Sequence, residues 1–79
     1  MDATFALWDL ETGNLVGAYD TEAAALAVVR RAIAQWGRES VATLALARES
    51  RGRTKALAEG EALVARALAT APEADARSA

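Results

Sequence analysis

The 79-residue chain contains neither histidine nor cysteine. The absence of histidine excludes the usual acid–base catalyst and the commonest metal ligand, and the absence of cysteine excludes a thiol nucleophile, a zinc finger and a disulfide framework. No segment contains the roughly 18 apolar residues that a transmembrane helix requires. Met1, Asp2 and Ala3 lack the basic and apolar regions of a signal peptide. We therefore expect a cytoplasmic protein with no membrane partner and no cofactor.

The remaining chemistry-bearing residues also favour a protein that is not an enzyme. Carboxylates two residues apart occur at the expected first turn and at the starts of the two expected helices: Asp9/Glu11, Asp20/Glu22 and Glu59/Glu61. Acidic residues are ordinary at such positions, and a catalytic or metal site would need them to converge in a cleft. The sequence therefore predicts no catalytic and no metal-binding residues.

Large apolar side chains are scarce. Alanine accounts for 22 of the 42 hydrophobic residues, which leaves 20 larger ones. A large side chain contributes roughly 1.5–3 kcal/mol when it is buried, and alanine contributes much less. A small domain without disulfides or metals commonly gains stability by burying surface against a copy of itself. We expect a single domain at residues 1–70 that forms a homodimer, followed by a disordered tail at residues 71–79.

The first third of the chain predicts a hairpin followed by a helix. Strands are expected at Thr4–Leu10 and Leu15–Tyr19, because both segments are rich in aliphatic and aromatic residues. Gly13 in the connection tolerates a positive φ, and Asp9 can accept hydrogen bonds from turn amides.

A helix is expected from about Glu22 to Trp36. Asp20 or Thr21 would cap its N-terminus, and Gly37 would end it. Its apolar stripe recurs at helical spacing at Leu26, Val29, Ile33 and Trp36.

The second half predicts a similar series of elements. A third strand is expected at Val41–Ala47, followed by a loop over residues 48–53 with Gly52 at its tightest point. Residues 54–58 are expected to form a fourth strand, although helix competes because alanine, leucine, lysine and glutamate all favour it. The last helix is expected from Gly60 or Glu61 to Ala69. The prediction is an α+β fold of order ββαββα, with a four-stranded antiparallel sheet and two helices on one face.

Strand parity leaves apolar residues on both faces of this sheet. Only one face meets the helices, so the open face, or an unpaired edge, is the candidate dimer surface. The candidate interface residues are Ala6, Trp8, Leu10, Val41, Thr43 and Ala45. The function expected is a non-catalytic interaction module that forms a homodimer and can bind another protein.

A basic cluster provides the alternative. Arg48, Arg51, Arg53 and Lys55 fall within eight residues of a chain whose net charge is −2. A basic hairpin tip can contact phosphates, which would make the protein a nucleic-acid-binding regulator. The competing interpretation is a solvated turn that keeps the edge of the sheet soluble.

Two segments resemble known families. Residues 7–16, LWDLETGNLV, resemble the last hairpin of a WD-repeat blade, but a helix follows where another blade would begin, so we interpret the likeness as convergence on one turn. Residues 20–33 are similar to the helix start in the antitoxin of Hic-type toxin–antitoxin pairs. That resemblance implies a small dimeric partner-binding protein. The whole chain resembles small uncharacterised bacterial domains with a hairpin–helix–hairpin layout, which implies a fold and no activity.

Overall fold

A computed structural model describes residues 3–69 of the chain. The disordered tail expected at residues 71–79 lies outside these residues. The elements are β1 (Thr4–Asp9), β2 (Asn14–Tyr19), α1 (Glu22–Trp36), the short 3-10 helix η1 (Arg38–Val41), β3 (Leu44–Ser50), β4 (Arg53–Glu59) and α2 (Gly60–Ala69). Apart from η1, this is the predicted ββαββα order.

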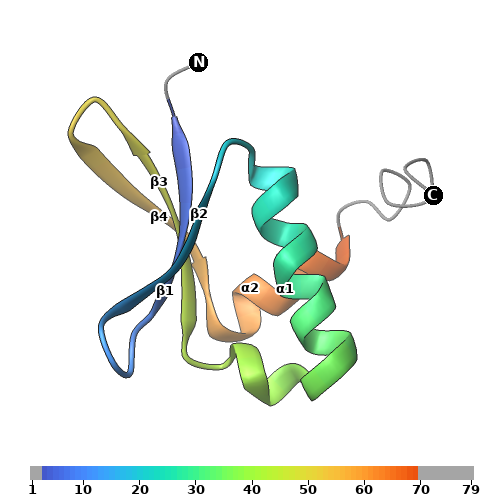
Figure 1. The fold of residues 1–79 in the computed structure, drawn as a ribbon. Coiled ribbons are helices and arrows are strands. Elements are labelled where there is room, and N and C mark those ends of the chain that lie inside the picture. Colours follow the sequence, from blue (N-terminus) through green and yellow to red (C-terminus); the bar gives the residue numbers. More distant parts are fainter. Residues whose placement is uncertain (1–2, 70–79) are drawn as a thin grey trace.

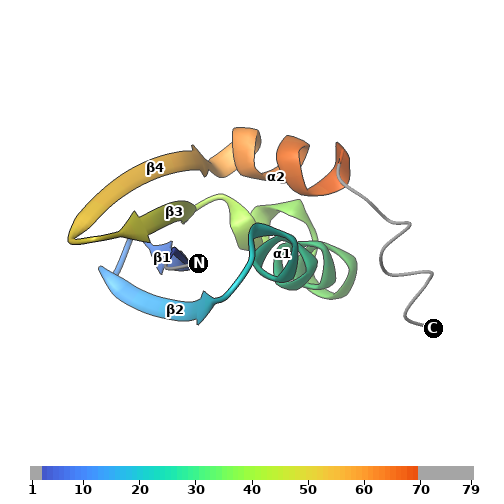
Figure 2. The ribbon, with the colours of Figure 1, turned by 90° about the horizontal axis from the view of Figure 1, so that it is seen from above.

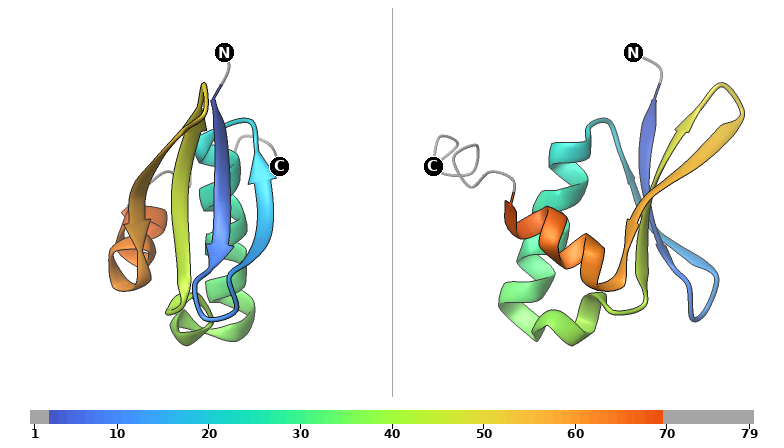
Figure 3. Two further views of the ribbon diagram at one scale, coloured as in Figure 1. Left: turned by 90° about the vertical axis from the view of Figure 1, so that its left-hand side faces the viewer. Right: turned by 180° about the vertical axis from the view of Figure 1, so that it is seen from behind.

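The four strands form one antiparallel sheet in the order β2-β1-β3-β4. Both helices lie on the same face, and no other element within residues 3–69 covers the opposite face (Figures 1 and 2). The helix α1 lies over β1 and β2, whereas α2 leaves the end of β4 and crosses α1 (Figure 3). The α+β fold is therefore confirmed. Neither α1 nor α2 is long and apolar enough to cross a membrane.

The first hairpin closes as the sequence predicts. Asp9 pairs with Asn14, and Gly13 between them has a φ of 77°. The Gly13 amide donates to the Asp9 carbonyl at 2.7 Å, and the Glu11 amide donates to the Asp9 carboxylate at 3.0 Å. The side chain and carbonyl of one residue thus hold the turn together.

The helix α1 has the predicted limits because both of its ends are capped. The Thr21 hydroxyl accepts a hydrogen bond from the Ala24 amide at 3.0 Å, which satisfies one of the free amides of the first turn. At the other end, the Gly37 amide donates to the Ile33 carbonyl at 2.8 Å.

The strand predicted at Val41–Ala47 begins three residues late, and its first part is wrong. The chain instead forms η1 after Gly37, where the Ser40 amide and hydroxyl both donate to the Gly37 carbonyl, at 3.1 and 2.7 Å. This turn carries Val41 inward, where it is fully buried between the helices and the sheet. The local hydrogen bonds and the burial of Val41 favour a turn over the extended chain expected at this point.

The second hairpin is longer and its turn tighter than predicted. Ser50 pairs with Arg53, so Arg51 and Gly52 form a two-residue turn, and residues 48–50 belong to β3 rather than to a loop. Both turn residues have positive φ, 56° and 77°, as in a type I′ turn. The segment at residues 54–58 is a strand, because it pairs along its length with β3.

The core lies between the sheet and the two helices. Leu7 and Leu46 pair at the centre of the sheet, and both are fully buried. They belong to a cluster with residues from α1, η1 and α2: Ala25, Leu26, Val29, Val41, Leu63, Val64 and Ala67. Two polar contacts also join the helices. Arg66 forms an ion pair with Glu22, and Arg30 donates to the Ala67 carbonyl at 3.2 Å.

Each outer strand carries a β-bulge. The pairing of β1 with β2 shifts between Leu7 and Trp8, which leaves Val16 as the extra residue. The pairing of β3 with β4 shifts between Leu46 and Ala47, which leaves Leu57 as the extra residue. A bulge redirects side chains locally. Val16 accordingly lines a groove beneath α1, and Leu57 packs against the core.

Candidate functional site

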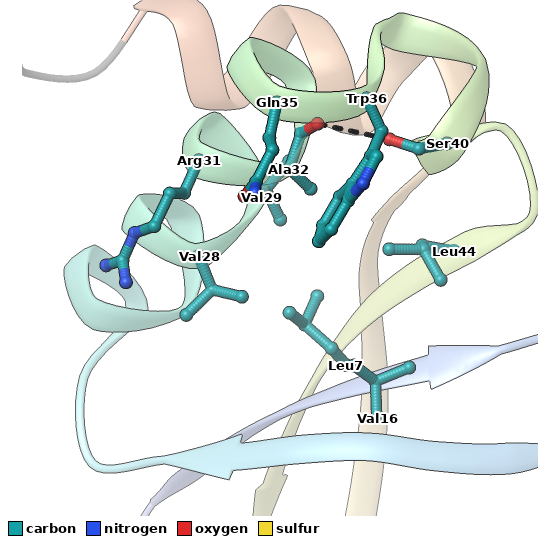
Figure 4. Close-up of a pocket in the computed structure, with 10 residues that line it drawn as sticks. All are labelled: Leu7, Val16, Val28, Val29, Arg31, Ala32, Gln35, Trp36, Ser40 and Leu44. Carbon is teal, nitrogen blue, oxygen red and sulfur yellow. Dashed lines mark hydrogen bonds between the residues drawn. The ribbon is translucent and has the colours of Figure 1, made fainter.

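An apolar groove of about 330 Å³ lies between α1 and the β1–β2 half of the sheet. We call it the α1–β2 groove. Figure 4 shows its lining: Leu7, Val16, Val28, Val29, Arg31, Ala32, Gln35, Trp36, Ser40 and Leu44. The Ser40 hydroxyl is 3.4 Å from the Ala32 carbonyl, so its polar group is turned toward the helix backbone. The surface that the groove presents is therefore mainly hydrocarbon.

Trp36 is the most exposed large side chain of the groove. Its ring extends from the last turn of α1 toward the sheet (Figure 4), yet 69% of the residue is exposed. The sequence placed Trp36 on the buried stripe of the helix with Leu26 and Val29. Trp36 lies on the groove side of the helix with Val29, but it is exposed rather than buried. An exposed tryptophan beside an open apolar groove is typical of a binding surface.

The groove borders the β2 edge of the sheet. β2 is an outer strand, and it contains no charged residue and no proline. Leu15 pairs with Trp8 on the open face, Val16 faces the groove, and both β2 residues are 50% exposed. Natural proteins usually protect an edge strand with charge, proline or a covering segment. β2 carries a bulge, but it has neither a charged residue nor a proline.

The opposite edge is protected by charge. β4 carries Arg53, Lys55 and Glu59 along its seven residues. Charged side chains on an edge oppose pairing with another strand because pairing would remove them from water. The two edges of this sheet therefore differ in their capacity to accept a further strand.

The residues predicted as an interface are dispersed. Ala6, Trp8 and Ala45 share the open face of the sheet, where Trp8 is opposite Ala45. Ala6 is only 1% exposed and Trp8 is half-buried, so this face exposes little of either side chain. Leu10 lies in the first turn, is 55% exposed, and donates its amide to the Thr43 carbonyl at 2.8 Å.

The remaining two predicted residues do not lie on a strand. Thr43 is an exposed turn residue just before β3, and Val41 is fully buried in the core. The parity argument that placed both on the open face is wrong, because it extended the strand through residues 41–43.

The predicted phosphate-contacting residues come together on the β3–β4 hairpin. Arg48, Arg51, Arg53 and Lys55 are all exposed, and they line a shallow hollow of about 640 Å³ with Ser50 and Thr54. We call these four cations the basic hairpin.

Residues 3–69 contain no cluster of three or more acidic side chains that could hold a metal ion. No buried side-chain nitrogen or oxygen in the described part of the chain lacks a hydrogen-bond partner. Two surfaces therefore stand out, the β2 edge with its groove and the basic hairpin.

None of the ten residues that line the α1–β2 groove was among the candidate site residues that the sequence predicted. The only local signal was Gly17 after Val16, since a glycine inside a strand often accompanies a bulge. Comparison with known proteins adds no relative: no family model, no curated protein and no solved structure matches this chain.

Proposed function

We propose that this protein is a non-catalytic interaction module that forms a homodimer through the β2 edge and the α1–β2 groove. The contrast between the two sheet edges carries the proposal. β2 is uncharged and apolar on both of its faces, whereas β4 carries Arg53 and Lys55 in its first half and Glu59 at its end. An unprotected edge next to an apolar groove is a surface that water solvates poorly.

A second copy fits this surface by symmetry. Two β2 strands can pair in antiparallel orientation about a twofold axis, so that each edge satisfies the other and the sheets become continuous. The same rotation brings the two α1 helices together on one face. Val16 and Trp36 of each copy would then lie at the junction between sheet and helix, where the partner's side chains cover them.

The chain's shortage of large apolar residues supports the same arrangement. The fully buried large side chains are four leucines and three valines, while Leu15, Val16 and Trp36 remain half or more exposed. Dimerisation at β2 would move Val16 and Trp36, which line the groove, into an interior. The domain would thereby gain apolar burial that its own chain does not provide.

Sedimentation equilibrium over the micromolar range tests the proposal. The expected mass is twice the 8.3 kDa of one chain, falling toward one chain on dilution. Val16→Lys should raise the dimer dissociation constant by about 30-fold, because each copy loses about 1 kcal/mol from a half-exposed valine that would be buried. The lysine charge at the junction would add to this effect.

Leu68→Lys is the matched control. Leu68 is 48% exposed and Val16 is 50% exposed, but Leu68 lies on α2 rather than at the β2 edge. The control should sediment like the unmodified chain. The proposal would be contradicted if the protein had the mass of one chain at every concentration. It would also be contradicted if the two lysine variants changed the dissociation constant equally.

A further inference from the structure

We infer that the basic hairpin binds the phosphate backbone of a nucleic-acid duplex. This site is separate from the β2 edge, since β4 is the opposite outer strand. The inference does not depend on dimer formation.

Strand register concentrates positive charge on one face of the hairpin. Arg48 pairs with Lys55, and Ser50 pairs with Arg53, so all three cations project to the same side. Glu49 pairs with Thr54 in the row between them and therefore projects to the other side. The alternation of the two strands thus removes the one carboxylate of residues 48–55 from the cationic face.

The net charge of the hairpin is opposite in sign to that of the rest of the chain. Residues 48–55 contain four cations and one carboxylate, a net charge of +3, while the whole chain has −2 and the remainder therefore −5. A polyanion would be repelled by most of the surface and attracted to this hairpin. Such a field orients a charged partner before contact.

The side chains of the four cations have no partner in the part of the chain that the structure describes. No ion pair or side-chain hydrogen bond there engages Arg48, Arg51, Arg53 or Lys55. Their charges are therefore available to an external anion. Three of the four are arginines, whose guanidinium groups can bind phosphate oxygens in a bidentate manner. Ser50 is in the same row as Arg53, so its hydroxyl is on the cationic face and can donate a further hydrogen bond.

Two features of the sequence make this hairpin less stable than it could be. Like charges directly opposite each other on neighbouring strands are destabilising, and Arg48 and Lys55 are such a pair. Arg51 has a φ of 56°, in a turn position that asparagine, aspartate or glycine would occupy at lower cost. Unfavourable choices concentrated at one exposed site are expected where a ligand supplies the compensating energy.

The shape of the hairpin favours a duplex over a single strand. The β3–β4 ribbon extends away from both helices (Figure 3), and a two-stranded ribbon can enter a major groove. Single-strand binding would need aromatic side chains free to stack on bases. The aromatic residues nearest to the hairpin in the strand register are Phe5, which pairs with Arg48, and Tyr19, which pairs with Phe5. Both rings pack against the core, so neither is free to stack on a base.

Fluorescence anisotropy with short labelled DNA and RNA duplexes at several salt concentrations tests the inference. Four phosphate contacts predict a slope of about −3.6 for log affinity against log salt with DNA, so affinity should fall about 150-fold between about 50 and 200 mM. Binding of one duplex type alone would support the inference and identify the source of the phosphates. No binding of either duplex at the lowest salt would overturn it.

Lys55→Gln and Arg38→Gln form a pair of variants with equal net charge. Arg38 is an exposed residue of η1, remote in sequence and structure from the hairpin. Lys55→Gln should weaken binding and reduce the salt slope by about one, and Arg38→Gln should leave the slope unchanged. Equal effects of the two variants would overturn the assignment to the hairpin.

The triple variant Arg48→Gln/Arg53→Gln/Lys55→Gln should abolish binding while the chain stays folded, because all three side chains are exposed and unpaired within residues 3–69. Thermal unfolding monitored by circular dichroism verifies the fold.

A labelled polyglutamate peptide, measured at the same ionic strength as the DNA and RNA duplexes, is the third probe. Polyglutamate binding as tight as duplex binding would overturn the choice of phosphate, and tighter duplex binding would support it.

Discussion

Gly17 is a glycine because the Tyr19 ring occupies the space of its missing side chain. Its φ is not positive, so alanine could adopt the same backbone. A Cβ built at Gly17, however, would overlap the Tyr19 hydroxyl oxygen and lie 2.8 Å from the Cζ atom of the ring. Gly17→Ala must therefore displace the ring from its position against the core.

Whether Gly17→Ala stabilises or destabilises the fold should depend on whether Tyr19 is present. Displacing the half-buried ring re-exposes about 40–80 Å² of apolar surface, which costs about 1–2 kcal/mol. Replacing a strand glycine with alanine gains about 0.5–1 kcal/mol, because the unfolded chain has less freedom to lose. Gly17→Ala alone should destabilise the fold by about 0.5–1 kcal/mol, and in a Tyr19→Ala background it should stabilise it by a similar amount.

Urea unfolding of the four proteins in this double-mutant cycle measures both values. The coupling energy between the two positions should be about 1–2 kcal/mol. If Gly17→Ala were equally destabilising with and without the tyrosine ring, the steric explanation would be refuted. The glycine would then have to serve the backbone of the bulge instead.

Three further predictions concern local features of the fold. Arg51→Asn should stabilise the protein by about 0.5–1 kcal/mol in urea unfolding, because asparagine favours this turn position; an unchanged midpoint would mean that the arginine is not strained. Thr21→Ala should cost about 1 kcal/mol and speed hydrogen exchange of the Ala24 amide, which loses its acceptor. Glu22→Gln should cost less than about 1 kcal/mol, and less still at high salt, because its ion pair with Arg66 is partly exposed; a salt-independent loss would indicate a different role for the carboxylate.

The sequence predicted best those elements whose ends are determined by local chemistry. The limits of α1 follow from the Thr21 cap and from Gly37, and the first turn follows from Asp9 and Gly13. Each of these signals acts within four residues, so no knowledge of the tertiary structure is needed. The basic hairpin belongs to the same group, because its four cations are close in sequence.

The features that escaped prediction depend on contacts between distant segments. Val41 leaves the expected strand because its burial between helices and sheet outweighs its strand propensity. The bulge at Val16 depends on the register between β1 and β2, which the sequence does not reveal. The α1–β2 groove therefore could not be anticipated, since it requires both the bulge and the exposed position of Trp36.

The unequal edges of the sheet also bear on how far self-association can proceed. A protein that adds copies through both edges of a sheet can grow without limit into a fibre. Here, a pair joined at β2 would present only two β4 strands to the solvent, each with Arg53, Lys55 and Glu59. Growth would then terminate at two copies, and the charges that repel a third would keep the pair dispersed.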